Sequence, residues 1–518
     1  MNTDSQPPTE PAAFSDIASR VRDHARQAPR RTALVCGDEA IDYATLDARM
    51  DAVVAALQRD GLGPGDAVAI CAPTSVAYAV VFLGALRAGL SVAPLAPGST
   101  AASLQRMAAD ADARLLYTAE GIDLGGGGPT RIALDGSSAG RPLADWLGGA
   151  GAPEPVAIAP EWPFNIIYSS GTTGEPKGIV QAHAMRWAYA ERAARFGYGA
   201  DTVALLSTPL YSNTTLVVFF PALTYGGTVV LMPKFDAVGW LALAERHRAT
   251  HAMLVPVQYE RLLARPEFDR TDLSSFRYKF STSAPFRADV KADALRRWPG
   301  GLVEFYGMTE GGGSCILEAH LHPDKLHTVG QPAPGHDILL IDEEGREVPQ
   351  GEAGEVVGRS GGMMSGYHKK PEATRAAEWF DAEGRRYIRT GDVGRFDADG
   401  FLVLLDRRKD LVISGGFNVY PSDLEAVLRE HPGVADVAVV GVPSVQWGET
   451  PVAAVVWREG AVPAEADAAA LLAWANARLG KTQRLAAVHS VEALPRSAIG
   501  KVLKRELRDA LAAGHRGS

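Results

Sequence analysis

Apolar runs with the character of strands alternate with amphipathic helical segments along the first half of the chain. The run TALVCG, residues 32–37, reads as a strand, and residues 44–62 follow it with apolar side chains at helical spacing and a glycine near the end. The run DAVAICAP then reads as a second strand, and SVAYAVVFLGALRAG as a second helix. Strand–helix alternation of this kind predicts α/β layers with a largely parallel sheet.

A single hydrophobic core cannot organise a chain of this length. The chain has 518 residues, and cores stop growing at roughly 250–300 residues, so at least two domains are expected. Composition changes near residue 330, where short strands and glycine-containing turns indicate a β-rich region. The last fifth of the chain mixes strands and helices and could form a small domain of its own. Within it, Ser422 and Glu425 fit a capping box that opens a helix.

Charge and cysteine content argue against several classes of protein. The formal net charge is −9 at pH 7, which argues against general binding to nucleic acids or anionic membranes. The three cysteines are far apart, so neither a disulfide framework nor a CxxC metal site is expected. The longest apolar run carries Arg87 and reads as a buried helix followed by a strand. The N-terminus lacks the features of a signal peptide. We therefore expect a cytoplasmic protein without integral membrane association or a nucleic-acid partner.

The stretch IIYSSGTTGEPKGIV, residues 166–180, has the composition of a phosphate-binding loop. Its glycines let backbone amides approach an anion closely, its hydroxyl groups add donors, and Lys177 adds a compact positive charge. It lacks the G-x-x-x-x-G-K-[ST] order of the common phosphate-binding loop. The alternative is a surface turn, but a turn needs neither the paired hydroxyls nor the lysine. We therefore favour a phosphate site.

Three further segments carry side chains suited to a nucleotide. In VEFYGMTEGGG, Tyr306 could stack on a planar base and Glu310 could hold Mg²⁺, although an incidental carboxylate at a strand-to-loop corner is equally favoured. In YIRTGDVGRFDADGFLVLLDRRKD, Asp392 and Arg407 suit the two hydroxyls of a ribose, although alone they read as a solvated hairpin. In LPRSAIGKVLKREL, Lys501 follows a turn and starts a basic helix, which alone reads as solvated.

Together these segments resemble the adenylate-forming superfamily, which contains acyl-CoA and aryl-CoA synthetases, firefly luciferase and the adenylation domains of peptide synthetases. The shared segments occur in the family's order and spacing and are YSSGTTGEPKG, YGMTE, RTGD, DRRKDLVISGGFNVYPSDLE and PRSAIGK. The resemblance covers nearly the whole chain, from Phe14 to Leu507. It is closest to CoA ligases of the 4-coumarate, fatty-acid and benzoate type.

The resemblance implies a fold and an activity. The fold is α/β, with a large N-terminal domain of two α/β subdomains and a β-barrel-like region, residues 1–408, and a small mobile α+β domain, residues 409–518, that turns about a hinge at Lys409. The activity converts a carboxylate and Mg-ATP to an acyl-adenylate and pyrophosphate, and then passes the acyl group to the thiol of coenzyme A. The implied cofactors and substrates are ATP, Mg²⁺, coenzyme A and a small carboxylic acid, and a homodimer is compatible with it.

The resemblance also assigns site residues, position by position. The pyrophosphate loop consists of Ser169, Ser170, Gly171, Thr172, Thr173, Gly174 and Lys177. The remaining nucleotide contacts are Ser283, Ala284, Pro285, Tyr306 as the adenine-stacking ring, Gly307, Met308, and Asp392 with Arg407 as the ribose clamp. The catalytic residues are Lys501, which bridges the carboxylate and the α-phosphate, Thr309 as a phosphate contact, and Glu310 as the Mg²⁺ ligand. After rotation of the small domain, the coenzyme A tunnel is formed by Ser414, Gly415, Gly416 and Phe417.

The acid end departs from the family pattern. Many relatives carry a histidine in a Pro-x-aromatic-His segment, whereas TPLYSNTT has Ser212 at that place, so gating by a histidine ring is not carried over. The expected acid pocket is lined by Tyr211, Ser212, Asn213, Thr214, Ser281, Ser283, Gly307, Met308 and Gly313, with Phe219 beside it. Gly311–Gly313 are expected to leave space for the acid. Hydroxyls and an amide next to aromatic rings suit a moderately polar aromatic acid or a medium-chain acid.

Other functions remain open at this point. The chain ends soon after Lys501 with no carrier-protein segment, which favours a CoA ligase over a stand-alone enzyme that loads a separate carrier protein or forms an amide. A luciferase-like oxygenase has no specific support. A non-catalytic nucleotide-sensing protein is disfavoured, because binding alone does not need Lys177, Glu310, Asp392, Arg407 and Lys501 together.

Overall fold

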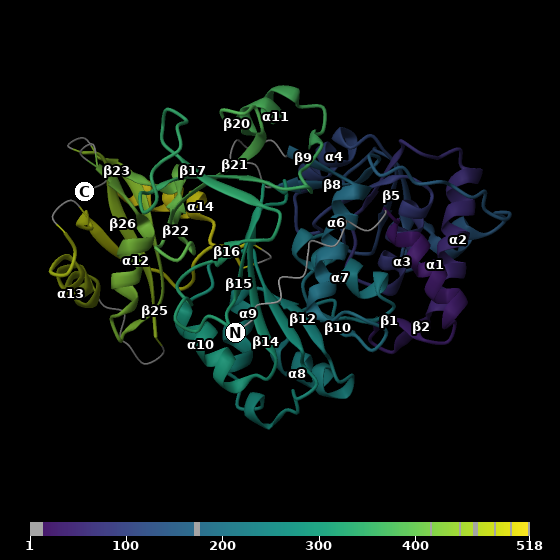
Figure 1. The fold of residues 1–518 in the computed structure, drawn as a ribbon, viewed down its shortest axis with the longest axis horizontal. Helices are drawn as coiled ribbons and strands as arrows, with labels where there is room; N and C mark the ends of the chain where they lie inside the picture. The colour runs from purple at the N-terminus through teal and green to yellow at the C-terminus, as the bar shows by residue number, and fades with distance from the viewer. Residues whose placement is uncertain are drawn as a thin grey trace, which may run out of the picture.

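The computed structural model describes residues 14–169, 177–414, 417–444, 447–458, 465–480, 483–497 and 500–515. In this part of the chain the strands form four sheets, two large and two small (Figure 1). The C-terminal sheet and its helices lie at one end of the long axis of the molecule, and the first helices lie at the other end (Figure 1). No helix of the described ranges is both long enough and apolar enough to cross a membrane.

A nine-stranded sheet carries much of the nucleotide end of the candidate site. Its strands, in spatial order, are β16 (Gln331–Pro332), β15 (Ser314–Glu318), β14 (Gly301–Gly307), β13 (Tyr278–Ser281), β12 (His251–Leu254), β10 (Val203–Leu206), β11 (Thr228–Leu231), β1 (Thr32–Cys36) and β2 (Glu39–Asp42). The pairings from β14 to β1 are parallel, and those strands are short apolar runs because both faces of the sheet are covered. One face packs on α8 (Ala237–Arg246), α9 (Pro256–Leu263), η2 (Phe268–Arg270) and α10 (Ala288–Arg297).

An eight-stranded sheet forms the second large layer. Its strands, in spatial order, are β19 (Gly366–Tyr367), β9 (Lys177–Ala182), β8 (Pro163–Ser169), β4 (Ser91–Pro94), β3 (Ala67–Ile70), β5 (Ala113–Thr118), β6 (Thr130–Ala133) and β7 (Arg141–Pro142). Leu104 and Met107 of α4 (Ala101–Asp110) pack on one face, and α5 (Leu143–Leu147) follows β7. The antiparallel hairpin of β8 and β9 encloses the glycine-rich segment between them.

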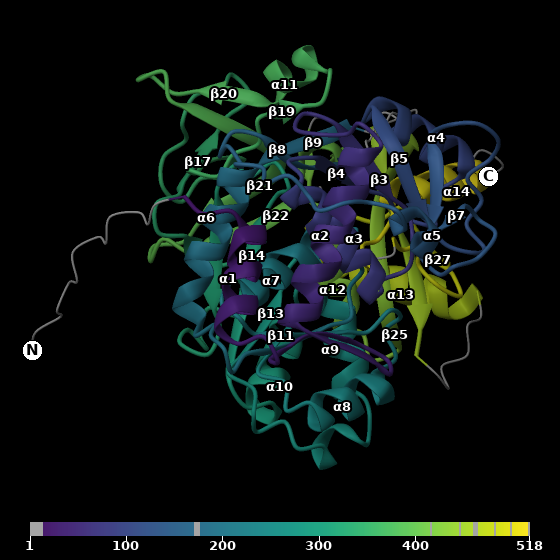
Figure 2. The same ribbon diagram turned by 90° about the vertical axis from the view of Figure 1, so that its right-hand side faces the viewer.

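The main core lies between the two large sheets. Its helices are α1 (Ile17–Gln27), α2 (Tyr43–Arg59), α3 (Val76–Arg87), α6 (His183–Ala193), which continues into η1 (Ala194–Phe196), and α7 (Asn213–Thr224). Figure 2 shows α1, α2 and α3 side by side. Arg87 ends α3 and forms ion pairs with Asp47 at 2.6 Å and Asp51 at 3.0 Å, and β4 follows. The longest apolar run is therefore a buried helix and then a strand, as predicted.

The β-rich region after residue 330 folds as a third, antiparallel sheet. Its strands are β17 (Asp337–Ile341), β18 (Gly354–Arg359), β21 (Arg386–Phe396), β20 (Glu378–Phe380) and β22 (Leu402–Arg407), with α11 (Pro371–Ala377) beside it. Its contact with the loop after β14 is made by glycine backbone, since a Cβ added to Gly358 would lie 1.7 Å from the carbonyl oxygen of Gly312. The two backbone segments meet here with no room for a side chain between them.

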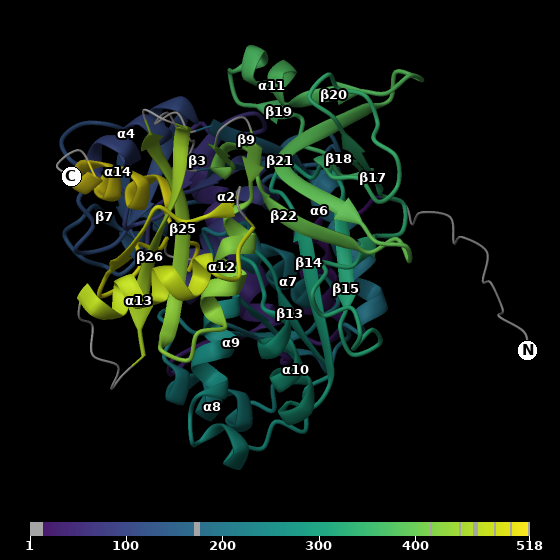
Figure 3. The same ribbon diagram turned by 90° about the vertical axis from the view of Figure 1, so that its left-hand side faces the viewer.

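The C-terminal sheet has its own core. Its strands are β24 (Phe417–Val419), β23 (Val412–Ser414), β26 (Gly448–Trp457), β25 (Val434–Ser444) and β27 (Ala487–Ser490), covered by α12 (Pro421–Arg429), α13 (Glu465–Asn476) and α14 (Lys504–His515). Two hydrophobic clusters here draw only on residues from position 412 onward. Figure 3 shows α12, α13 and α14 grouped with β25 and β26. The expected α/β fold with a smaller α+β part at the C-terminus is confirmed.

The prediction that Ser422 and Glu425 form a capping box is wrong. Helix α12 begins at Pro421, and its N-cap residue is Tyr420. The Ser422 hydroxyl donates to the carbonyl oxygen of Leu405 in β22, and the Glu425 carboxylate accepts from the amide of Val439 at 2.9 Å. Proline at the first helical position starts the helix one residue before Ser422. Ser422 and Glu425 therefore fasten α12 to neighbouring strands.

Candidate active site

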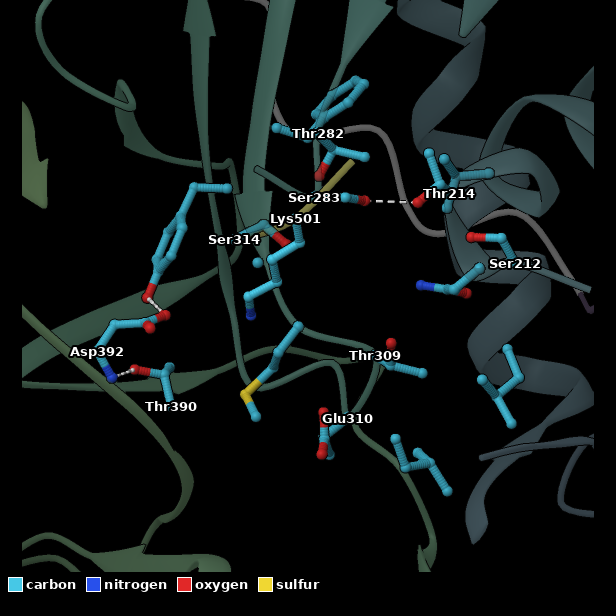
Figure 4. A pocket seen from close by; sticks show the side chains of 18 of the residues that line it. Ser212, Thr214, Thr282, Ser283, Thr309, Glu310, Ser314, Thr390, Asp392 and Lys501 are labelled. Carbon is cyan, nitrogen blue, oxygen red and sulfur yellow. Dashed lines mark hydrogen bonds between the residues drawn. The ribbon is translucent and has the colours of Figure 1, made fainter. Parts of the chain in front are cut away.

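A cavity of about 1800 Å³ lies where the two large sheets, the third sheet and the C-terminal segment meet. Figure 4 shows some of the side chains that line it. The charged residues singled out in the sequence all lie on its wall, although they come from four separate parts of the chain: Lys177, Glu310, Asp392, Arg407 and Lys501. The fold therefore brings the four motif segments to one place.

Lys177, which belongs to the first of these segments, lines the cavity. This residue starts β9 and pairs with Ser169, the last residue of β8, so the hairpin fixes both ends of the glycine-rich loop. The Lys177 ammonium lies 5.1 Å from the ring centroid of Tyr367, within the range of a cation–π contact. The loop residues predicted to hold phosphate lie outside the described residues; they are Ser170, Gly171, Thr172, Thr173 and Gly174.

Three hydrogen bonds from other parts of the chain hold Thr309 and Glu310 in the turn that follows β14. The Tyr367 hydroxyl donates to Glu310 Oε1 at 2.9 Å, the Met364 amide donates to the Glu310 carbonyl at 2.7 Å, and the Gln181 amide donates to the Thr309 carbonyl at 2.6 Å. Burial raises the pKa of the Glu310 carboxyl above its ordinary value. Tyr367 belongs to none of the motifs singled out in the sequence, and it contacts Glu310 across 57 residues of chain.

A carboxylate, a phenol and a guanidinium meet at the edge of the third sheet. Asp392 of β21 and Arg407 of β22 are opposite each other in the strand pairing, and Arg407 Nε lies 3.1 Å from Asp392 Oδ1. The Tyr306 hydroxyl donates to Asp392 Oδ2 at 2.9 Å (Figure 4). The Asp392 amide donates to the Thr390 hydroxyl at 3.0 Å, which fixes the backbone of β21 next to the carboxylate. The aromatic ring and the carboxylate are thereby locked to each other.

Lys501 reaches the same cavity from the C-terminal part of the chain. It follows a tight turn in which the Ser497 amide donates to the Lys501 carbonyl at 2.8 Å and the Lys501 amide donates to the Ser497 hydroxyl at 3.2 Å. Figure 4 shows its side chain extending into the middle of the pocket. Burial, followed by the charge of Arg407, lowers the pKa of Lys501 to about 8. An ammonium group at this place faces the point between the Asp392–Arg407 pair and the Thr309 turn.

The cavity continues past Lys501 toward α6 and α7. Tyr211, Ser212, Asn213 and Thr214 line it at the start of α7, and the Thr214 hydroxyl lies 2.5 Å from the hydroxyl of Ser283. Met308 and Gly307 line the opposite wall. The deeper part has aromatic walls contributed by Phe196, Tyr198, Phe280 and Phe305. The cavity thus joins a charged end to an end with aromatic walls.

Comparison with known proteins shows to which family the chain belongs. The family model described as AMP-binding enzyme matches residues 21–368, and the model of the AMP-binding enzyme C-terminal domain matches residues 423–501. The first match alone covers more than half of the chain. The chain belongs to the AMP-binding, adenylate-forming enzyme family.

Individual members of the AMP-binding family match over nearly the whole chain. Feruloyl-CoA synthase of Amycolatopsis sp is 34% identical over 496 residues, which cover 93% of this chain and 96% of that protein. The ATP-bound structure of MatB from Rhodopseudomonas palustris has a TM-score of 0.86 at 30% identity, covering 96% of this chain and 99% of that one. The amide bond synthetase McbA from Marinactinospora thermotolerans has a TM-score of 0.84 at 30% identity, covering 95% and 99%.

In this AMP-binding enzyme several predicted lining residues lie outside the cavity wall. Ser281 ends β13 with its side chain buried, and Thr282 lines the cavity in its place, because successive side chains of an extended segment point to opposite faces. Phe219 is also buried away from the cavity. The wall passes through Ser283 but not through the two residues after it, Ala284 and Pro285.

The glycines after Glu310 do not provide space for an acid. A Cβ added to Gly311 would lie 2.1 Å from the carbonyl oxygen of Gly362, and one added to Gly313 would lie 2.5 Å from the Ile338 side chain. All of Gly311–Gly313 is buried against the third sheet, and Ser314 lines the cavity next to it. The prediction that these residues leave room is wrong: they allow two backbones to touch.

The residues expected at the hinge and at the coenzyme A tunnel lie apart from each other. Lys409 is in η3 (Arg408–Asp410), directly after β22, and lines the cavity. Ser414 ends β23 and is not on the cavity wall in this arrangement, and Phe417 begins β24. Gly415 and Gly416 lie outside the described residues.

A divalent cation would find the Glu310 carboxylate at this site. Within the described ranges there is no group of three or more histidine, cysteine, aspartate or glutamate residues that could hold a metal ion. Glu310 Oε1 accepts from Tyr367, which leaves its other oxygen to face the cavity. Mg²⁺ usually takes one or two carboxylates, with water and substrate phosphates completing its shell, so this donor set fits Mg²⁺ that arrives with a nucleotide.

Proposed function

We propose that the chain is an acid–thiol ligase that activates an aromatic or medium-chain carboxylic acid as acyl-AMP and then transfers the acyl group to coenzyme A. One observation carries this proposal: Lys501 extends into a cavity with the Asp392–Arg407 pair and Glu310 on one side and a pocket with aromatic walls on the other. Membership of the AMP-binding family and the similarity to feruloyl-CoA synthase support the reaction class.

In the first step, an oxygen of the substrate carboxylate attacks the α-phosphorus of ATP. The new bond joins the acyl oxygen to phosphorus, the bond to the β-phosphate breaks, and pyrophosphate leaves. Asp392 and Arg407 would hold the ribose hydroxyls and Tyr306 the adenine, so the α-phosphate is fixed in front of Lys501. The Lys501 ammonium would stabilise the negative charge that develops between the two reactants. Lys177 would hold the departing phosphates.

Magnesium belongs to this proposal as the partner of Glu310. When bound with ATP, the ion neutralises charge on the phosphates. The protein's own part is to hold the Glu310 carboxylate in place through Tyr367 and the two backbone hydrogen bonds of the Thr309 turn.

In the second step, the thiol sulfur of coenzyme A attacks the acyl carbon, and AMP leaves. Lys501 would have to withdraw, because it occupies the space between the reactants. We place the boundary between a large domain, residues 1–408, and a mobile domain, residues 409–518, at Lys409. The separate hydrophobic clusters after residue 412 and the short η3 connection support rotation as a unit. Ser414 to Phe417 would then line the thiol's path.

Replacing Lys409 by proline is expected to slow the thioester step about tenfold or more and to change adenylation by less than about threefold. Proline fixes φ near −65°, which η3 tolerates but a rotating hinge does not. ATP–pyrophosphate exchange measures the first step, and conversion of synthetic acyl-adenylate to thioester measures the second. The control is Lys409→Ala, which removes the same side chain and leaves the backbone free. Equal losses in both steps would rule out a hinge at this position.

The proposed function is tested with a panel of carboxylic acids in a pyrophosphate-release assay, with and without coenzyme A. We expect aromatic and medium-chain acids to be used and thioester to form. Exclusive use of acetate or of amino acids would overturn the acid class. Pyrophosphate release without coenzyme A consumption would favour the second candidate, an enzyme that passes the acyl group to an amine or a carrier protein, a possibility supported by the similarity to an amide bond synthetase.

A further inference from the structure

The deep end of the cavity carries polar groups that the reaction described above does not use. Helix α6 runs along the cavity from the level of Glu310, because a Cβ added to Gly311 would lie 2.6 Å from the terminal carbon of Met185. Arg192 comes seven residues after Met185, which places it two helical turns, or about 10 Å, deeper. Arg192 and His336 both line the cavity at that depth, beside the aromatic walls.

Arg192 is a partly buried cation without a counter-ion. Its guanidinium stacks on the ring of Tyr189 at 4.7 Å, and its Nη1 donates to His336 Nε2 at 2.6 Å. No carboxylate of the described residues lies within salt-bridge distance of it. The neighbouring acids are engaged elsewhere, since Glu318 pairs with Arg195 at 2.5 Å and Asp337 pairs with Arg359 at 2.9 Å. A charged group withdrawn from water in this way is costly unless a partner of opposite sign is supplied.

One carboxylate remains near the guanidinium. Glu191 precedes Arg192 in α6 and also lines the cavity, but it makes no ion pair with an arginine or lysine of the described chain. Adjacent residues of a helix do not form close side-chain pairs, and the Glu191 charge acts on Arg192 without a direct contact that an ion pair would require. It reduces the net positive potential of the deep end without neutralising the guanidinium.

His336 holds the Arg192 guanidinium by a hydrogen bond. Only 8% of the residue is exposed, and burial, followed by the charge of Arg192, lowers the pKa of His336 to about 4. The ring is therefore neutral at neutral pH. Arginine can only donate, so Nε2 accepts and the ring proton is on Nδ1. Nδ1 is buried and has no hydrogen-bond partner among the described residues. Nδ1 therefore does not face the cavity, and His336 acts through Nε2, which holds the Arg192 guanidinium at the wall.

A further arginine strengthens the positive potential of α6. Arg186 is 2% exposed, and its guanidinium lies 5.9 Å from the centroid of the same Tyr189 ring. Its Nε donates to the Asn165 side chain at 3.0 Å, while both terminal nitrogens lack partners among the described residues. Burial lowers the pKa of Arg186 to about 10, so it stays charged at neutral pH. Helix α6 therefore carries two arginines, one on either side of Tyr189, and no carboxylate of the described residues forms an ion pair with either.

We propose that Arg192 and His336 form a second anion-binding subsite, which selects a substrate acid with a further carboxylate at the end remote from the one that is activated. This proposal rests on the proposed ligase function and specifies its substrate class as aromatic or medium-chain dicarboxylic acids. The planar guanidinium matches a carboxylate, and His336 Nε2, which accepts from Arg192 Nη1, holds the guanidinium in position. One carboxylate would lie at Lys501 and the other at Arg192, and the aromatic walls would enclose the apolar part between them.

Matched acid pairs test the subsite. Octanedioate is compared with octanoate, and 4-carboxycinnamate with cinnamate, by kcat/KM in pyrophosphate release. We expect the diacid to be preferred roughly ten- to a hundredfold in each pair, as charge-assisted hydrogen bonds of a partly buried pair imply. Arg192→Met should abolish the preference by lowering kcat/KM for the diacids and leaving it unchanged or raised for the monoacids, and Arg192→Lys should retain part of it.

The matched control is Arg195→Met. Arg195 lies three residues further along the chain, on the wall of the same cavity, but it already pairs with Glu318. Its loss should leave the diacid-to-monoacid ratio unchanged. Unfolding temperatures identify variants that are merely unstable, for which Arg192→Lys then provides the comparison.

The outcomes separate the subsite from the ligase function. Equal or better use of the monoacids by the wild-type protein would overturn the subsite, as would a preference that survives Arg192→Met or a stronger, Arg192-dependent preference for the uncharged phenol 4-coumarate. If no acid gives pyrophosphate, the ligase function fails, and calorimetric titration with 4-carboxycinnamate decides the subsite separately. Binding that is weakened at least tenfold by Arg192→Met would support it, and binding that is absent or unchanged by the substitution would overturn it.

Discussion

The Lys501→Ala variant is expected to form acyl-adenylate about 10²–10³-fold more slowly than the wild-type protein, because it removes a preorganised cation from the point where charge develops. The same variant should convert synthetic acyl-adenylate to thioester at a nearly normal rate, since that step requires the side chain to leave. ATP–pyrophosphate exchange measures the first step, and single-turnover thiolysis measures the second. Normal exchange in the variant would refute the assignment of Lys501 to the first step.

The same lysine should determine how adenylation depends on pH. Burial lowers the pKa of Lys501 to about 8, and the charged form is the active one, so kcat/KM for ATP should hold below pH 8 and fall as the pH rises above it. Lys501→Arg keeps a charge that does not titrate in this range, so its residual activity should lack the fall. A fall with unchanged midpoint in the arginine variant would assign the titration to another group.

The Glu310→Gln variant is expected to lower the rate of adenylation about 10²-fold and to raise the Mg²⁺ concentration needed for half-maximal rate. Glutamine has the shape of glutamate and its oxygen can still accept from Tyr367, so the turn should keep its position. Initial rates over a Mg²⁺ titration measure both effects, and an unchanged unfolding temperature confirms that the turn is intact.

Tyr367→Phe is the matched control for Glu310→Gln. It removes the hydroxyl that donates to Glu310 Oε1 at 2.9 Å and keeps the carboxylate. It should cost only a few-fold in rate, because a single hydrogen bond is worth roughly one kcal/mol. If Glu310→Gln left the Mg²⁺ dependence unchanged, the carboxylate would not be the metal ligand.

The nucleotide end of the site could be located from the sequence because its residues lie in short motifs. Lys177, Glu310, Asp392, Arg407 and Lys501 are assigned through the resemblance of these motifs to those of the adenylate-forming superfamily, and all five lie on one cavity. A motif gives the residue and its local conformation together. The long-range pairing that brings these segments together came only with the structure, and the roles of the five residues remain predictions.

The acid end could not be located in this way. Ser281 and Thr282 are neighbours in sequence and equally suited to a polar wall, and only the direction of the strand decides which one faces the cavity. Arg192 and His336 are 144 residues apart and belong to no motif. Their contact depends on how α6 packs against the corner after β16, a property of the tertiary structure that no local pattern encodes.

The contact between Gly312 and Gly358 affects how sequence conservation or mutational tolerance is interpreted in such a chain. Because any side chain at Gly358 would collide with the backbone of Gly312, these positions should be as intolerant of change as the residues that meet the substrate. A map of invariant positions would therefore mix two populations around Glu310, one chosen for its chemistry and one for having no side chain at all. An invariant glycine in this loop would indicate that two layers of the protein lie in close contact there. It would not indicate a role in the reaction.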